Sequence, residues 1–292
     1  MNQQQSICSQ AREKTRAKRA ATQVFSFLTL RAAAFVNCAA LVIACVFLFV
    51  NGIGALNIDF VLDSPREMMT SGGVFPCLVG TFLLAAGAIA IALPFGVACA
   101  VWLNEYGKQG PVVDIVRLSV ANLAGVPSIV FGLFGLAFFV TALGFNVSLL
   151  SGILTLAVLT LPVIINTTEE ALKQVPRSWR DASLALGATK SQTIGRIVLP
   201  SALPGILTGA ILAVARAAGE TSAVMFTAAV FYTPKLPESV WSSVMALPYH
   251  MYVLATAGTE IEKTRPMQYG TGLLLVVLVF AMNLIAILIR DK

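Results

Sequence analysis

Hydrophobic residues run in long uncharged stretches that are separated by short charged segments. No charged residue occurs in 32–57, 68–104, 118–168, 197–215 or 266–289. One transmembrane helix needs about 20 apolar residues, so 118–168 holds two helices, divided at the turn signal Gly144-Phe145-Asn146. The fifth stretch reaches full length by continuing through the charges that follow it. The pattern predicts an all-α polytopic membrane protein with six transmembrane helices, at 30–54, 76–103, 117–142, 147–166, 201–231 and 269–290.

The composition narrows the class of protein further. Of the 292 residues 57% are hydrophobic and 12% are charged, about half the charged fraction of a soluble domain. This deficit excludes a disordered chain, a secreted disulfide-rich protein and an ordinary cytosolic protein. Five Cys without CxxC spacing and a single His predict no disulfide framework and no metal site. The sequence lacks the P-loop pattern GxxxxGK[ST], and we expect no cofactor.

The placement of charge predicts how the chain lies in the membrane. The net charge is +6, but most basic residues flank apolar stretches, which favours membrane topology over nucleic-acid binding. With six spans, most of the 20 Lys and Arg fall on one side, so we expect both termini to be cytoplasmic. Residues 1–30 are then a basic cytoplasmic tail that is solvated by water, with a weak attraction to anionic membrane lipid as the alternative. The domain 31–292 has a cytoplasmic loop at 167–200 and an extracytoplasmic loop at 233–268.

The loop 167–200 predicts two short helices. Ser178 is a candidate N-cap for a helix ending near Gly187, and a second helix begins near Ser191. An apolar knob with a charged rim forms on the first helix, from Trp179, Ala182, Leu186 and the small Gly187. Such a knob suits a groove on a partner protein. An amphipathic helix lying on the bilayer is the alternative.

Arg216 and Glu220 lie near the middle of the predicted fifth span. Each charge at that depth costs about 2.5–3.5 kcal/mol. Four residues apart on a continuous helix, they share one face and form either a mutually neutralising structural pair or a binding site. In the second interpretation Arg216 binds an anion through two bonds and Glu220 accepts a hydrogen bond from it, beside the polar Thr221 and Ser222. A carboxylate next to an anion favours a protonated oxyanion, such as hydrogen phosphate, over sulfate.

Helix breakers interrupt three of the predicted spans. Pro94 and Pro162 predict kinks, because an intramembrane Pro frees a carbonyl that needs another partner. Gly125-Val126-Pro127-Ser128 predicts either a kink or the opening of a polar path that Ser128 lines.

A motif in the loop 167–200 carries a family resemblance. Asp181-Ala182-Ser183, three residues, Gly187, nine residues and Ile197-x-Leu199-Pro200 resemble the EAA loop of ABC-importer permeases, EAA-x3-G-x9-I-x-LP. Asp181 replaces the usual Glu, and Ser183 replaces the second Ala. The resemblance implies the type I ABC importer permease fold and a helix that inserts into a cleft of a separate ATPase. The residues it implies for ATPase coupling are Asp181, Ala182, Ser183, Gly187, Ala188, Ile197 and Pro200.

Three further segments, 122–135, 215–221 and 247–252, resemble the PstA-type permeases of phosphate ABC importers. The PstC type shares much of this pattern, so both subunit roles stay open. The resemblance implies a bacterial inner-membrane subunit that is not an enzyme and forms half of a phosphate path by alternating access. It implies as partners a pair of ATPase subunits (PstB type), a paralogous PstC-type permease and a periplasmic or extracellular phosphate-binding protein. The substrate path would include Arg216, Glu220, Thr221 and Ser128.

Three other functions fit parts of the pattern. A permease for sulfate, molybdate or phosphonate differs from a phosphate permease only in the narrower motifs. A passive anion channel or secondary transporter would also use intramembrane Arg and Glu, but has no need of an EAA-type loop. A membrane-embedded enzyme would need a catalytic constellation, which one His and no nearby paired acids do not supply.

Overall fold

The computed structural model describes residues 2–107, 110–257 and 261–290, and the chain divides into two compact units, Met1–Asn51 and Gly52–Lys292. The first unit consists of most of α1, Asn2–Gly52. This helix begins far before residue 30, where the sequence predicts it, because no Gly or Pro precedes Gly52. The apolar stretch Ser26–Ala55, which continues three residues past the end of α1, is a candidate membrane span whose most apolar window has no residue buried inside the protein.

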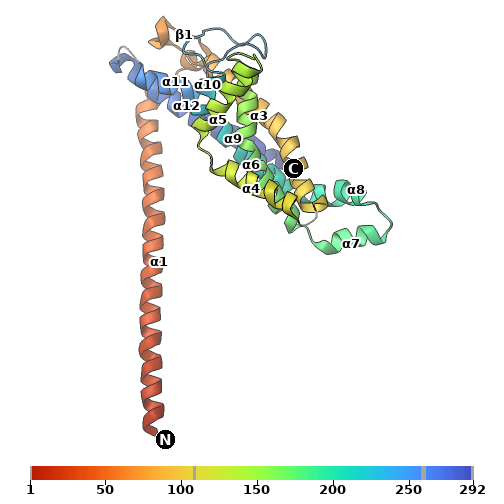
Figure 1. Cartoon of the computed structure of the whole chain (residues 1–292). Coiled ribbons are helices and arrows are strands. Elements are labelled where there is room, and N and C mark those ends of the chain that lie inside the picture. The colour runs from red at the N-terminus through yellow and green to blue at the C-terminus, as the bar shows by residue number, and fades with distance from the viewer. Residues whose placement is uncertain (1, 108–109, 258–260, 291–292) are drawn as a thin grey trace. The chain divides into compact units, whose positions relative to one another are not determined.

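The second unit is built of helices with one small hairpin (Figure 1). Its first part contains η1 (Ile53–Ala55), α2 (Ile58–Leu62), β1 (Pro65–Arg66), η2 (Glu67–Met69) and β2 (Ser71–Gly72), with β1 and β2 antiparallel. The helices of the predicted spans follow: α3 (Phe75–Val101), α4 (Pro111–Gly125), α5 (Ser128–Gly135), α6 (Leu149–Gln174), α9 (Leu199–Ala218) and α12 (Ile261–Arg290). Between them lie the short helices α7 (Arg177–Ala185), α8 (Lys190–Thr193), α10 (Ser222–Thr227) and α11 (Leu247–Thr256). Three π-helical stretches continue or precede them: η3 (Trp102–Tyr106), η4 (Leu136–Ala142) and η5 (Ile194–Val198).

The spans predicted from the sequence are largely present. Besides Ser26–Ala55, the helical stretches long and apolar enough to cross a membrane are Phe75–Tyr106, Leu149–Gln174, Lys190–Ala218 and Thr264–Leu288. The predicted helix 117–142 is instead a broken pair, Pro111–Gly125 and Ser128–Ala142, bent by 103°. Counting the pair as one span gives six, so the chain is a multi-pass, all-α membrane protein.

The core of the second unit lies where α6 packs between α3 and α9. In α6, 67% of the most apolar window is buried, the largest share among the candidate spans. Small residues allow the close approach, as in other membrane helix pairs. A Cβ on Gly96 of α3 would lie 2.6 Å from Cγ2 of Ile164, and a Cβ on Gly209 of α9 would collide with the hydroxyl of Thr167.

Further boundaries predicted from the sequence are also wrong. The fifth helix does not continue to 231, because α9 ends at Ala218 and the chain turns before α10. Ser178 is not an N-cap, since Pro176 takes that position with φ −58° and ψ 138°. Proline suits the start of a helix because its missing N–H has no intrahelical partner there.

The two ends of the second unit differ in character. Figure 1 shows α7 and α8 at the end opposite β1. At the β1 end a buried cluster joins Phe60, Val74, Met245, Leu247 and Leu254. The loop predicted at 233–268 contains α11, whose 10 residues are too few to cross a bilayer. Its placement outside the membrane stays a prediction.

Candidate functional site

The break between α4 and α5 follows from Pro127. The residue before a proline is disfavoured in the helical region, and Val126 accordingly adopts φ −73° and ψ 132°. Pro127 is itself extended and caps α5, which begins at Ser128. The sequence predicts a kink or an opened path here, and the 103° bend is far larger than a kink. Ser128 thus lies at the first position of a helix that starts inside an apolar segment.

The break between α9 and α10 places two charges at helix ends. Arg216 lies in the last turn of α9, and Gly219 is the C-cap. A cation is favourable in that turn because helix carbonyls give it a partial negative charge. Glu220 and Thr221 lie in the turn before α10, which begins at Ser222.

The two breaks come together because α5 packs on α10. A Cβ on Gly132 of α5 would lie 2.8 Å from the carbonyl oxygen of Ser222 and 3.1 Å from Cα of Ala223, so only Gly permits this approach. The Glu220 carboxylate lies close enough to the Ser128 hydroxyl and the Arg216 guanidinium to be influenced by both. The structure therefore brings together three residues that the sequence predicts for the substrate path.

The relation between Arg216 and Glu220 differs from the sequence prediction. The two residues do not share one helix face, because the helix ends between them. Within the described residues, no ion pair joins the Arg216 guanidinium to Glu220 or to another carboxylate. The mutually neutralising pair is therefore not what the structure contains. Arg216 is exposed on the surface of this chain, and Glu220 and Thr221 are half-buried.

This arrangement is chemically suited to a small anion. The guanidinium offers five N–H donors in a planar fork, which matches oxyanion geometry. Glu220 adds an acceptor, and Ser128 adds a hydroxyl at a helix N-terminus. Discontinuous helices whose ends face one another at membrane depth are a common way to build a transport site.

The second predicted site, around the EAA-like motif, forms an arm made of α7 and α8. Gly187 ends the first helix with φ +82°, a conformation that favours glycine. Thr189 and Gln192 then form a reciprocal capping box at the start of α8. The predicted second helix therefore begins at Lys190, one residue before Ser191.

The motif residues divide into an outer and an inner set. Leu186 is 90% exposed and Trp179 is 51% exposed, and Asp181, Ala182 and Gly187 are also exposed. Ser183 is buried and Ala188 is half-buried. Ile197 lies half-buried in η5, and Pro200 is exposed at the start of α9. The outer set exposes the apolar side chain of Leu186 where α7 ends and that of Trp179 near the start of α7.

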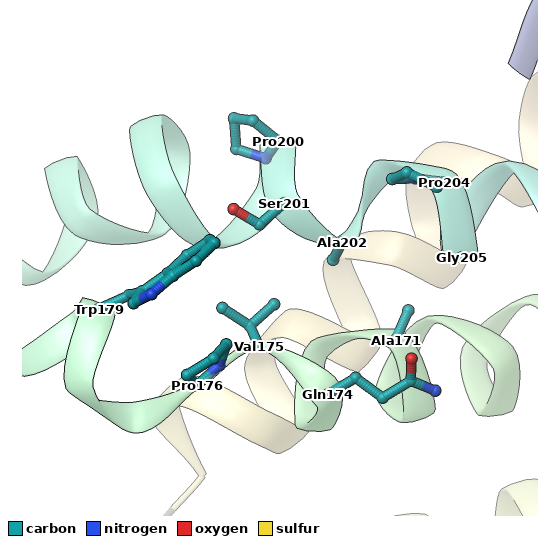
Figure 2. Close-up of a pocket in the computed structure, with 10 residues that line it drawn as sticks. All are labelled: Ala171, Gln174, Val175, Pro176, Trp179, Pro200, Ser201, Ala202, Pro204 and Gly205. Atoms are coloured by element: carbon teal, nitrogen blue, oxygen red, sulfur yellow. The ribbon is translucent and has the colours of Figure 1, made fainter. Parts of the chain in front are cut away.

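A cavity of about 550 Å³ lies between the arm and the bundle. Figure 2 shows Trp179 and Pro176 on one side of it and Pro200 and Ser201 on the other. The rest of the wall comes from the facing ends of α6 and α9, with Ala171 and Gly205 among its residues.

Three ion pairs near the arm, each with a largely buried carboxylate, were not found from the sequence. Arg180 pairs with Glu105 at 2.7 Å, and Glu169 accepts from both Arg117 at 2.9 Å and Lys173 at 2.8 Å. Only the pair of Glu169 and Lys173 could be predicted from the sequence, because the two residues lie four positions apart on one helix. The others join residues 52 and 75 positions apart in sequence, and no local pattern encodes such pairs.

No group of three or more His, Cys, Asp or Glu residues in the described part of the chain is placed to hold a metal ion. The single histidine, His250, is buried in α11, where burial lowers its pKa to about 4. Its Nδ1 lies 3.5 Å from the Thr271 hydroxyl, and its Nε2 is buried with no hydrogen-bond partner. His250 is thus a neutral core residue of the β1 end.

Comparison with known families gives these features a context. The family described as "binding-protein-dependent transport system inner membrane component" matches residues 92–291. The chain belongs to this family. It is the membrane permease subunit of an ABC importer, and the matched region includes both helix breaks and the α7–α8 arm.

Individual relatives of this permease cover most of the chain. It is 33% identical to "Probable ABC transporter permease protein YqgI" of Bacillus subtilis, over 85% of this chain and 90% of that protein. It is 40% identical to "Phosphate transport system permease protein PstA 1" of Mycobacterium tuberculosis, over 75% of this chain and 71% of that one. A PstA protein of Xylella fastidiosa is 31% identical over 88% and 94% of the two chains.

Solved structures support the permease fold. A chain of the inward-facing MetNI methionine ABC transporter aligns with TM-score 0.58 and 23% identity, over 75% of this chain and 93% of that chain. A bacterial ABC transporter involved in alginate import aligns with TM-score 0.58 and 13% identity, over 77% and 80% of the two chains. The permease therefore has the type I ABC importer fold that the EAA resemblance implies.

Proposed function

We propose that this chain is the PstA-type membrane subunit of an ATP-driven importer of inorganic phosphate. In this proposal it forms half of the translocation path and works with a pair of ATPase subunits, a PstC-type permease and a phosphate-binding protein. Both termini lie in the cytoplasm of a bacterial cell, and the arm faces the ATPase. The PstA relatives support the choice of phosphate.

The observation that carries the proposal is the meeting of the two helix breaks. Arg216 is exposed and Glu220 is half-buried, and the Glu220 carboxylate lies near both Arg216 and Ser128. Because Arg216 lies on a surface of this chain, a second permease packed there would enclose a path with the guanidinium on its wall. The charge then stabilises a phosphate ion that has left most of its water.

Glu220 gives this path its selectivity. A carboxylate beside an anion is repulsive unless the anion donates a hydrogen bond to it. Hydrogen phosphate carries a proton at neutral pH and sulfate does not. A site that leaves a buried polar group unpaired with the wrong substrate discriminates strongly against that substrate. We therefore expect Glu220 to favour phosphate over sulfate.

The arm supplies the coupling to ATP hydrolysis. The exposed Trp179 and Leu186 fill a cleft of the ATPase subunit. When ATP binds, the two ATPase subunits close and move the arm. The helices that follow the arm then pivot and expose Arg216 first to one side of the membrane and then to the other. The permease itself performs no covalent chemistry.

The test is reconstitution of the chain with its ATPase, second permease and binding protein in liposomes. The expected result is ATP-dependent uptake of radiolabelled phosphate, with little uptake of sulfate. Equal uptake of both ions, or uptake that continues without ATP, would overturn the proposal.

Glu220→Gln in the same liposomes tests the role of the carboxylate, with Glu238→Gln in the exposed outer loop as a matched control. We expect phosphate uptake to fall and discrimination against sulfate to weaken only in the first variant. If Glu220→Gln leaves both unchanged, the selectivity mechanism is wrong.

A further inference from the structure

Arg180 points inward from a helix whose other side faces outward. It is 17% exposed, and its sequence neighbours Trp179 and Asp181 are exposed. The guanidinium donates from Nη2 to Oε1 of Glu105 at 2.7 Å and from Nε to the same oxygen at 3.2 Å. This side chain is therefore separate from the exposed apolar side chains of the arm.

The same guanidinium also binds the end of α6. Nη1 donates to the carbonyl of Val175 at 2.6 Å, and Nη2 donates to the carbonyl of Leu172 at 2.9 Å. Carbonyls in the last turn of a helix lack intrahelical donors and accept from basic side chains. Arg180 thus contacts α6 and, through Glu105, the end of α3.

The Glu105 side chain is also largely buried and makes a further hydrogen bond besides those with Arg180. It lies in η3, the π-helical continuation of α3, and its side chain is 9% exposed. Its Oε1 also accepts from the amide nitrogen of Asn104 at 2.8 Å. A buried, fully hydrogen-bonded pair of this kind has a defined geometry, because a planar guanidinium binds a carboxylate through two bonds.

We propose that the Arg180–Glu105 pair is the mechanical joint between the arm and the membrane helices. When the arm moves, this pair transmits the displacement to the ends of α3 and α6, which belong to the core next to the substrate path. Arg180 and Glu105 are positioning residues and touch neither ATP nor phosphate. The inference rests on the proposed coupling of the arm to an ATPase.

Breaking the joint uncouples hydrolysis from transport. The exposed apolar docking surface of the arm is unchanged, so the ATPase still binds and still hydrolyses ATP. The ends of α3 and α6 no longer follow the arm, so fewer phosphate ions move per ATP. A residue that served stability alone would lower both rates together as folded complex was lost.

The experiment measures phosphate uptake and ATP hydrolysis on the same liposomes containing the complete complex. Glu105→Gln keeps the side-chain volume and the hydrogen bonds from Arg180 to α6. Arg180→Lys keeps the positive charge but loses the planar guanidinium and its paired N–H donors. Matched controls are Glu170→Gln on α6 and Arg196→Lys on η5, both exposed. The amount of complex and its melting temperature are recorded for every variant.

We expect phosphate imported per ATP to fall about tenfold in Glu105→Gln and by a smaller factor in Arg180→Lys, with both controls at the wild-type ratio. Wild-type ratios in both joint variants would overturn the inference and leave the proposed function intact. If the wild-type arm does not bind the ATPase, the proposed function fails instead.

A distance measurement separates the joint from a purely stabilising contact. Spin labels on Ser178→Cys and Trp102→Cys, both exposed positions, report the separation of α7 and η3 in a background without other cysteines. With the joint intact, the distribution of distances between the two labels stays narrow in both the nucleotide-free and the ATP-bound state. With Glu105→Gln it broadens when ATP binds. An unchanged distribution would contradict the proposal even if transport were reduced.

Discussion

The side-chain oxygens of Ser183 on α7 and Thr193 on α8 lie 2.9 Å apart, and both residues are buried. Ser183 stands where the EAA pattern has its second alanine. The departure from the pattern therefore has a structural reason: the hydroxyl links the two helices of the arm across Gly187.

Ser183→Ala leaves the buried Thr193 hydroxyl without this partner. We expect a loss of about 1–3 kcal/mol in the free energy of unfolding of the arm, measured by thermal unfolding of the purified protein in detergent. Replacing both partners, with Ser183→Ala and Thr193→Val, removes the unpaired group and is expected to cost less than the single change. If the double variant is the less stable of the two, the hydrogen bond is not what links α7 and α8.

Arg216→Gln removes the cation that the proposed path offers to the anion. We expect ATP-dependent phosphate uptake to fall about 10- to 100-fold, which corresponds to about 1.5–3 kcal/mol for a hydrogen bond to a charged group. The variant also leaves Glu220 to repel the substrate, so adding Glu220→Gln should recover part of the lost uptake. Uptake near the wild-type level in Arg216→Gln would remove Arg216 from the substrate path.

Gly187→Ala tests the backbone of the arm without any steric contact. A Cβ at Gly187 would meet no atom within 4 Å, but its φ of +82° is unfavourable for alanine. We expect about 1–2 kcal/mol of destabilisation and weaker binding of the ATPase. Gly195→Ala is the matched control, because it also meets no atom and has no positive φ. Equal melting temperatures for the two variants would contradict the prediction.

His250 predicts a pH dependence of stability at the β1 end. Its pKa is lowered from 6.5 to about 4 by burial, so the unfolded chain binds the proton more readily than the folded chain. The free energy of unfolding is therefore not reduced by this group above pH 6.5, and it falls by up to about 3 kcal/mol as the pH drops toward 4. His250→Gln should flatten this part of the profile of melting temperature against pH. An unchanged slope would assign the pH dependence to other groups.

The long apolar helices could be predicted from the sequence because lipid demands about 20 apolar residues in each span. The two breaks were harder to predict. Pro127 marks its break in the sequence, but the 103° bend depends on α5 packing against α10. No proline marks the break at Gly219–Thr221, so the sequence predicts a continuous helix there.

Part of the candidate site could be predicted for the same reasons. Arg216, Glu220 and Ser128 are conspicuous as polar residues in apolar stretches, and the EAA-like spacing locates the arm. Arg180 has no such signal, because charged residues are ordinary in a loop and its partner Glu105 lies 75 positions away. Contacts between distant segments are a property of the fold and have no local pattern.

The π-helical turn of η3 closes with a bond from the Gly107 N–H to the Trp102 carbonyl at 2.7 Å. Such a turn holds one residue more than a regular helical turn. Glu105 lies near its end, so its direction differs by up to about 100° from that of an α-helical continuation. Deleting one residue between 102 and 106 would swing the acid away from its basic partner while both residues remained in the chain. In this permease, the spacing of residues in that short stretch thus matters as much as their chemical identity.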